Sequence, residues 1–192
     1  MKLIVITGGI GSGKSVVSRL VNVMGYPTYD CDSEAKRLMN ESFELKAQLC
    51  ELLGNDAYDS TRCIDRSYVA SRIFSDKALL AQMNAIVHPA VRNDIKRWCE
   101  TRPESVAFVE TALLAESGLG ADADAVWVVD APLQLRVERV MSRSNLSRSE
   151  VEARIASQAD KFDFTGSYHI INDNVHSLIK QITRLLYEGV KE

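Results

Sequence analysis

The sequence contains no long hydrophobic run, and none of its apolar stretches approaches the ~18 residues that a membrane-spanning helix needs. Met1 and Lys2 lead directly into an apolar segment, so we expect no cleavable targeting segment. Hydrophobic residues make up 46% and charged residues 26% of the 192 positions, which is typical of a globular protein. We therefore expect one cytoplasmic domain with no membrane association.

Metal-binding patterns are also missing. The four cysteines and three histidines are scattered, and no C-x-x-C pair or other zinc spacing occurs among them. In a chain with no export signal, isolated cysteines are expected to be reduced thiols. These residues are Cys31, Cys50, Cys63, Cys99, His88, His169 and His176.

An excess of basic residues is absent too, because 23 Lys and Arg face 26 Asp and Glu, giving a net charge of −3. This balance argues against a general nucleic-acid-binding protein, although a local basic pocket remains possible. The sequence has no internal repeat and no low-complexity tract, and nothing in it indicates an obligate protein partner.

A glycine-rich loop is the strongest feature present. Residues 8–15, GGIGSGKS, fit the pattern G-x-x-x-x-G-K-[ST]. The β-branched run 3–7 before the loop predicts a buried strand, and apolar residues at helical spacing over 16–24 predict a helix after it. Loop amides and the helix N-terminus would then bind the phosphates of a nucleotide. The candidate nucleotide-binding residues are Gly9, Gly11, Ser12, Gly13, Lys14, Ser15 and Val16.

Two residues of this loop have expected chemical roles. The lysine of the pattern, Lys14, reaches the outer phosphates, and the final hydroxyl, that of Ser15, ligates Mg²⁺. The pattern therefore predicts a nucleotide bound together with magnesium.

A pair of aspartates ends the next predicted strand, which covers residues 26–32. In an extended segment Asp30 and Asp32 fall on the same side. Asp32 could be merely the N-cap of a helix that runs to Met39. Because parallel strands end at the same sheet edge, we also expect Asp32 to face the phosphate loop.

Residues 42–103 show helical periodicity and no clear strand, which predicts a helical insertion suited to gripping an acceptor molecule. One helix is expected to stop at Gly54. Pro89 suits the first turn of another, so His88 is either a helix-start residue or part of the acceptor site.

Three further strands complete the predicted sheet, over residues 105–110, 125–131 and 168–172, and an amphipathic helix over 175–186 follows. We expect an α/β fold with a five-stranded parallel sheet and helices on both faces. Glu110 ends the third strand and either contacts magnesium through water or faces solvent.

Arginines mark the helix after the fourth strand. Arg136, Arg139 and Arg143 are spaced to share one helical face, which is either a solvated surface or a phosphate-binding face. Ser147 and Glu150 form a capping-box pattern for a second helix. The hairpin over 139–160 is therefore a candidate lid over the nucleotide.

Guanine-specific motifs are absent. The chain has no N-K-x-D, and its only D-x-x-G begins at Asp163, before the fifth strand. A switch similar to the small G proteins is therefore disfavoured. A phosphoryl-transfer enzyme needs an acceptor pocket, a base and cations on the transferred group, and the insertion, Asp32 and the arginines can supply these parts.

Over nearly its whole length the sequence resembles the dephospho-CoA kinases, which are similar to nucleoside-monophosphate kinases. The motifs that carry the resemblance are T-G-G-I-G-S-G-K-S at 7–15, D-x-D at 30–32, H-P at 88–89, Q-x-x-x-x-R-x-x-x-R at 134–143 and R-I-x-x-Q at 154–158.

The resemblance implies ATP-dependent phosphorylation of the ribose 3′-hydroxyl of dephospho-CoA, the last step of coenzyme A synthesis, with Mg²⁺ and with ATP as co-substrate. It implies Asp32 as catalytic base beside Lys14 and Arg139, and phosphate contacts for Arg143. His88 and Leu113 are the further expected acceptor contacts. The expected organisation is a core of residues 1–41, 104–138 and 161–192, the insertion over 42–103, and the lid over 139–160.

Two departures from the family pattern stand out. Residues 112–116 lack the proline and the aromatic residue of P-L-L-F-E, and Asp173-Asn174-Val175 replaces the usual N-N-G or D-N-G. Neither departure touches the phosphate loop or Asp32. The alternatives are a kinase of another small nucleotide or hydroxyl acceptor and a nucleotide-binding switch protein.

Overall fold

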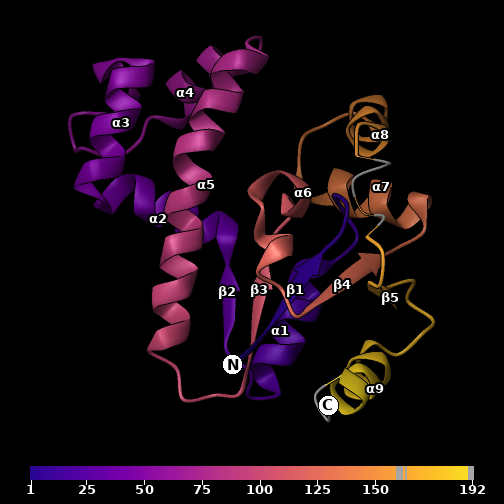
Figure 1. Cartoon of the computed structure of the whole chain (residues 1–192). Helices are drawn as coiled ribbons and strands as arrows, with labels where there is room; N and C mark the ends of the chain where they lie inside the picture. The colour runs from indigo at the N-terminus through magenta and orange to yellow at the C-terminus, as the bar shows by residue number, and fades with distance from the viewer. Residues whose placement is uncertain (159–161, 163, 190–192) are drawn as a thin grey trace. The chain divides into compact units, whose positions relative to one another are not determined.

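The structure is a computed structural model that describes residues 1–158, 162 and 164–189 (Figure 1). Parts of the predicted lid over 139–160 and core segment over 161–192, and Asp163 of the D-x-x-G string, lie outside the described residues. The chain divides into two units. One comprises Met1–Tyr29 with Pro103–Glu192, and the other comprises Asp30–Arg102.

The first unit is built on a five-stranded sheet with strand order β2-β3-β1-β4-β5. The strands are β1 (Lys2–Thr7), β2 (Thr28–Asp30), β3 (Val106–Glu110), β4 (Ala125–Asp130) and β5 (Tyr168–Ile171). Strand β1 pairs in parallel with β3 and β4, and β4 pairs in parallel with β5. The predicted parallel α/β fold is confirmed, and the glycine-rich loop follows the central strand.

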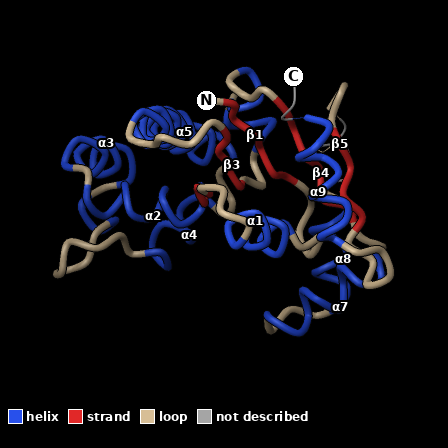
Figure 2. Tube along the Cα trace, turned by 90° about the horizontal axis from the view of Figure 1, so that it is seen from below, coloured by secondary structure: helices blue, strands red, loops and turns tan. Residues whose placement is uncertain are grey.

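Helices α1 (Lys14–Val23) and α9 (Leu178–Gly189) cover one face of the sheet (Figure 2). Phe108 lies at the centre of this core, with its ring centroid 5.0 Å from that of Trp127 and 5.7 Å from that of Tyr26. Strand residues of the opposite alternation are buried as well, which explains the nearly continuous apolar runs. They are Leu3, Val5, Ala107, Val109 and Val128.

The last helix begins later than the sequence pattern predicts. Val175 is 84% exposed and precedes α9, which starts at Leu178. The reason is local, because the Asp173 carboxylate accepts hydrogen bonds from the backbone N–H groups of Val175 and His176. This Asx-type turn competes with helix formation over the same residues.

A helical hairpin follows β4 in the first unit. Helix α7 (Leu133–Arg143) and helix α8 (Arg148–Ala156) pack through a small apolar core of Val137, Val140, Val151 and Ile155. The predicted capping box is present, since Ser147 and Glu150 exchange side-chain and backbone hydrogen bonds at the start of α8. The short helix α6 (Leu114–Ser117) and the 3₁₀ turn η2 (Leu119–Ala121) lie between β3 and β4 in sequence.

The second unit is helical among its residues 30–102, all of which are described. Its elements are α2 (Cys31–Glu41), α3 (Phe43–Leu53), η1 (Asn55–Ala57), α4 (Arg66–Ile73) and α5 (Lys77–Glu100). As predicted, α3 ends just before Gly54. Within the part of the chain that is described, no helix is both long enough and apolar enough to span a bilayer.

The expected helix start at Pro89 is wrong, because α5 runs through this residue without interruption. An internal proline removes one backbone donor and costs about 3 kcal/mol or more. Val87, Val91 and Ile95 form one buried stripe that continues past it, and α5 packs against α2 and α3. Burial of this stripe offsets the cost of the proline.

Candidate active site

The glycine-rich loop joins the end of β1 to the start of α1. Gly13 has a φ of 97° and precedes the first helical residue, Lys14. No side chain of the described residues caps the first amides of α1. These amides and the helix dipole therefore favour an anion at this end of the helix.

The loop packs tightly against Arg136 and Asn172. Gly11 has a φ of 79°, and a Cβ atom there would lie 2.6 Å from the carbonyl oxygen of Arg136. A Cβ on Gly13 would collide with the Asn172 side-chain amide, and one on Gly9 would collide with the Arg136 guanidinium. Glycine is needed here because neighbouring groups occupy the space of a side chain.

The front of the loop is open. Ser15 and Val16 are exposed at the first turn of α1, and the Lys14 ammonium donates a hydrogen bond to the carbonyl of Gly8 at 2.8 Å. The predicted nucleotide-binding residues between Gly9 and Val16 thus lie in one strand–loop–helix junction, while the other predicted one, Arg143, lies at the end of α7.

Arg139 lies beside this junction. Its Nη1 donates to the carbonyl of Ser12 at 3.4 Å, and its Nη2 donates to the side-chain oxygens of Asn174 at 2.8 Å and Asn172 at 3.4 Å. Asn172 is buried, and its Nδ2 donates to the same Ser12 carbonyl at 2.8 Å. Arg143 follows Arg139 by one helical turn and is exposed at the end of α7.

Sequence reasoning missed two groups that brace the loop. Arg136 donates through Nε to the carbonyl of Ile10 at 2.9 Å, and burial lowers the pKa of its guanidinium. Gln158 accepts a hydrogen bond from the Ile10 amide at 2.9 Å. Gln158 belongs to the R-I-x-x-Q motif, so the motif could have indicated its role. Arg136 was marked only by sharing a predicted helical face with Arg139 and Arg143.

Glu110 and Leu113 belong to the same unit. In the β1–β3 register Glu110 lies opposite Ile6, one residue before the end of β1. Leu113 is 39% exposed, and its amide donates to Thr111 Oγ1 at 3.0 Å. Within the described residues no group of three or more His, Cys, Asp or Glu could hold a metal ion. Hydroxyl and carboxylate oxygens at one sheet edge do suit Mg²⁺, which keeps water and phosphate ligands.

Asp32 belongs to the second unit, in the first turn of α2. The N-cap of α2 is Asp30, whose Oδ1 accepts hydrogen bonds from the amides of Asp32 at 3.0 Å and Ser33 at 3.4 Å. The capping role considered for Asp32 is therefore wrong. The extended pairing of the two aspartates is wrong as well, because the chain turns helical at Cys31. The exposed Asp32 carboxylate is not used as a cap.

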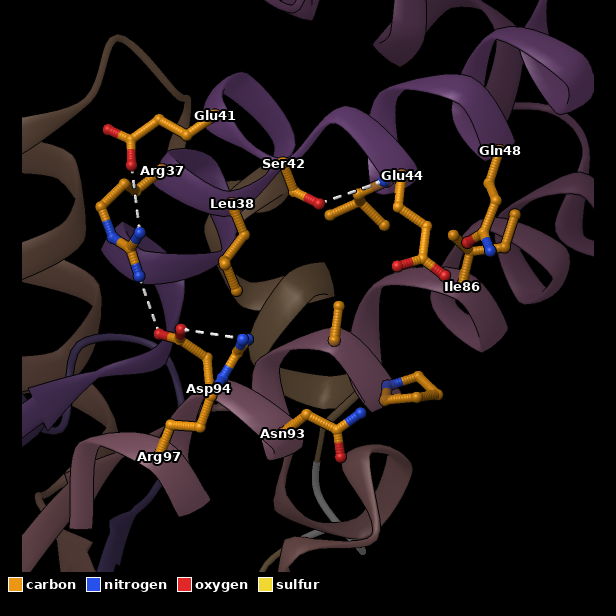
Figure 3. Close-up of a pocket in the computed structure, with 13 residues that line it drawn as sticks. Arg37, Leu38, Glu41, Ser42, Glu44, Gln48, Ile86, Asn93, Asp94 and Arg97 are labelled. Atoms are coloured by element: carbon orange, nitrogen blue, oxygen red, sulfur yellow. Dashed lines mark hydrogen bonds and ion pairs between the residues drawn. The ribbon is translucent and has the colours of Figure 1, made fainter. Parts of the chain in front are cut away.

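A cavity of about 520 Å³ lies between α2, α3 and α5 of the second unit (Figure 3). Pro89 lines this cavity, but His88 does not. Its polar lining residues are Arg37, Glu41, Ser42, Glu44, Gln48, Asn93, Asp94 and Arg97, and its apolar ones are Leu38, Leu45, Ile86, Pro89 and Ala90.

The charges of the cavity largely pair with one another. Arg37 binds Asp94 at 2.8 Å and Glu41 at 3.1 Å, and Arg97 lies 3.7 Å from Asp94 (Figure 3). The hydrogen bond that Arg37 donates to the Glu34 carboxylate is the main cause of the raised pKa of Arg37. The cavity therefore offers amide groups, at Gln48 and Asn93, among arginines already held by carboxylates.

The sheet order, the phosphate loop after the central strand and the arginines on the helix after β4 define a P-loop kinase. A protein-family model described as dephospho-CoA kinase matches residues 2–178. The chain belongs to the dephospho-CoA kinase family, as the sequence motifs predicted, and it is therefore a kinase of the final step of coenzyme A biosynthesis.

Individual relatives agree with this assignment. A dephospho-CoA kinase of Bacteroides fragilis is 37% identical over 184 residues, 94% of this chain and 89% of that protein. A Thermus thermophilus crystal structure matches with a TM-score of 0.77 and 34% identity, covering 99% of this chain and 96% of that one. A dephospho-CoA kinase from Campylobacter jejuni shares the fold, with a TM-score of 0.71, 24% identity and coverage of 100% and 98%.

Proposed function

We propose that this protein transfers the γ-phosphoryl group of ATP to the ribose 3′-hydroxyl of dephospho-CoA. The observation that carries the proposal is the arginine–phosphate-loop junction, where the Arg139 guanidinium is held at the Ser12 carbonyl beside the amides of α1. In this reaction the enzyme acts mainly by positioning groups and by stabilising charge.

The first unit contributes the nucleotide site. Lys14 and the amides of residues 9–16 hold the β- and γ-phosphate oxygens, and Arg139 and Arg143 offset charge that develops on the transferred group. Mg²⁺ would be held by the Ser15 hydroxyl and, through water, by Glu110, and it supplies positive charge at the phosphate oxygens.

Asp32 is the proposed base. It accepts or orients the proton of the 3′-hydroxyl as the oxygen attacks phosphorus. Support comes from its exposed carboxylate, which is left available because Asp30 caps α2. The reaction requires that this carboxylate and the γ-phosphate meet the same hydroxyl, and the facing of Asp32 toward the loop stays a prediction.

The helical insertion over 42–103, with the end of α2, is the proposed acceptor-binding part. Its cavity suits an uncharged chain bearing amides, such as the pantetheine arm, because Arg37 and Arg97 are already paired with carboxylates. We assign His88 and Leu113 as further acceptor contacts. Residues 139–160 are the proposed lid, and 1–41, 104–138 and 161–192 the core.

We further propose that the partners are these small molecules alone and that the protein works in the cytoplasm, without nucleic acid or an obligate protein partner. The net charge of −3 supports the exclusion of nucleic acid.

Mass detection of coenzyme A tests the reaction. The purified protein is mixed with ATP, Mg²⁺ and dephospho-CoA, and we expect catalytic turnover to coenzyme A. Asp32→Asn should keep ATP binding and lose about 10²- to 10⁴-fold in kcat, because a general base is removed without a change of shape.

Asp76→Asn is the matched control for this substitution. Asp76 is an exposed capping aspartate of α5 in the same unit, and asparagine caps equally well, so kcat should stay unchanged. Slow ATP hydrolysis that ignores the acceptor would instead support a switch protein. Faster transfer to a different hydroxyl compound would support another acceptor.

A further inference from the structure

We propose that Asn174 is a positioning residue that fixes the guanidinium of Arg139 at the phosphate loop. The inference rests on the proposed function, because it concerns the residue assigned to offset charge on the transferred phosphoryl group. Asn174 lies in the segment where this sequence departs from the family pattern by lacking a glycine.

The first support is the hydrogen bonding of Arg139. Its shortest recorded hydrogen bond goes to Asn174 Oδ1, at 2.8 Å, while those to Asn172 Oδ1 and the Ser12 carbonyl are both 3.4 Å. Arginine has a long side chain with about 2 kcal/mol of rotamer entropy, so an unheld guanidinium samples many positions. The Asn174 contact selects the position beside the loop.

The chemistry of the acceptors matters as well. All three recorded acceptors of Arg139 among the described residues are amide oxygens, two from side chains and one from the backbone. Amide oxygens orient a guanidinium without neutralising it, in contrast to the carboxylates that hold Arg37 in the second unit. Arg139 therefore keeps its charge for a phosphate.

The backbone of Asn174 provides the second support. Its φ is 67°, in the left-handed region, which non-glycine residues seldom adopt and which asparagine tolerates best. The neighbouring Asp173 carboxylate fixes the turn by accepting hydrogen bonds from Val175 N at 2.9 Å and His176 N at 2.8 Å. Asparagine thus tolerates this backbone conformation, and its side-chain amide reaches Arg139.

Asn172 connects the same loop to the phosphate site. Its buried side chain donates to the Ser12 carbonyl at 2.8 Å and lies against Gly13. The loop after β5 is therefore anchored to the phosphate loop at Asn172, two residues ahead of the contact between Asn174 and Arg139. The two asparagines place α7 and the phosphate loop in one hydrogen-bonded arrangement.

The test separates the side chain of Asn174 from its backbone. Asn174→Gly keeps the left-handed conformation and removes only the amide. We expect kcat for coenzyme A formation to fall about tenfold, the size of one lost hydrogen bond to a charged group, with Tm and KM for dephospho-CoA unchanged. Asn174→Ala should lose the same activity and also lower Tm, because alanine is strained at this φ.

A double-mutant cycle distinguishes positioning of Arg139 from a merely structural role. A structural role would lower kcat whether or not Arg139 is present. In an Arg139→Ala background, Asn174→Gly should cause no further loss, because the group it positions is gone. Asn22→Gly, at an exposed asparagine of α1 outside the proposed sites, is the control and should leave kcat as in the wild type.

Two results would overturn the inference alone, namely wild-type kcat in Asn174→Gly, or an equal loss in both Arg139 backgrounds. An Arg139→Ala variant with full kcat would remove both the inference and the role given to Arg139. Absence of coenzyme A formation by the wild-type protein is the separate failure of the proposed function.

Discussion

Asp30 and Asp32 take different positions at the start of α2. Asp30 binds the amides of Asp32 and Ser33, so its carboxylate stabilises the helix. Asp32 is not used as the cap, and its carboxylate is exposed. The sequence marked both residues, but it could not assign the cap, because a shift of two residues in the helix start exchanges their roles.

At the same scale, Gly11 of the phosphate loop and Gly25, which follows α1, are glycines for different reasons. Gly11 and Gly25 both have positive φ, of 79° and 93°. A Cβ on Gly11 would meet the backbone of Arg136, whereas one on Gly25 would meet nothing within 4 Å. Alanine at Gly25 would therefore introduce backbone strain alone, and alanine at Gly11 would add a steric clash.

We predict that Gly25→Ala costs about 1–2 kcal/mol of unfolding free energy, the cost of a left-handed alanine. Gly11→Ala should cost more and should also weaken ATP binding, because the loop must move away from α7. Urea unfolding and ATP titration measure both effects. Equal losses of stability would show that the contact with Arg136 carries no weight.

The pH dependence of the loop after β5 also follows from single residues. Hydrogen bonds from His176 N and Val175 N, with the His176 side chain, hold the pKa of Asp173 well below its ordinary value of 3.8. A depressed carboxyl pKa gives stability that is fully present above the ordinary value and is lost as the pH falls below it.

Asp173→Asn should therefore lower the stability at pH 7, and the difference from the wild type should shrink as the pH falls from about 4 toward the depressed pKa. Unfolding curves across this acid range provide the measurement. A difference that stays constant with pH would contradict the assignment of these hydrogen bonds to the charged carboxylate.

Among the elements, the α7–α8 hairpin determines how the phosphate loop is held. The hairpin contacts the phosphate loop through Ile10, whose side chain packs on its apolar core and whose amide and carbonyl bind Gln158 and Arg136. The position of the loop thus depends on the hairpin. A loss of local stability in α8 should therefore lower the affinity of the loop for a nucleotide.

Ser147→Ala tests this dependence. Loss of the capping box should cost about 1 kcal/mol, and ATP affinity should fall with it, because α8 leads to Gln158 at the loop. Ser142→Ala, on the exposed side of α7, should change neither quantity appreciably. Denaturation and ATP titration of both variants are sufficient, and identical behaviour of the two would disprove the coupling.

On the scale of the whole molecule, the chain consists of a sheet unit and a helical unit. The nucleotide-binding residues that we propose belong to the sheet unit, and Asp32 with the cavity belongs to the helical one. Substrates that use different units should stabilise the protein by separable amounts, since each ligand adds stability through its own binding constant.

Lys14→Ala should abolish most of the rise in Tm that ATP causes and leave the rise caused by dephospho-CoA. At a ligand concentration of one hundred times Kd the wild-type stabilisation should be about 2.7 kcal/mol. Thermal unfolding with each substrate alone makes the comparison. Equal loss of both shifts would mean that the two sites are not separate.

The sequence by itself determined the strand–loop–helix junction, the parallel α/β class and the family, because these depend on local patterns: β-branched runs, glycine spacing and helical periodicity. Tertiary structure alone decided the uninterrupted α5 through Pro89, the clamp of Arg136 and Gln158 on Ile10, and the contact of Asn174 with Arg139. These features join residues distant in the chain, or depend on burial that outweighs a local preference, so no local pattern could specify them.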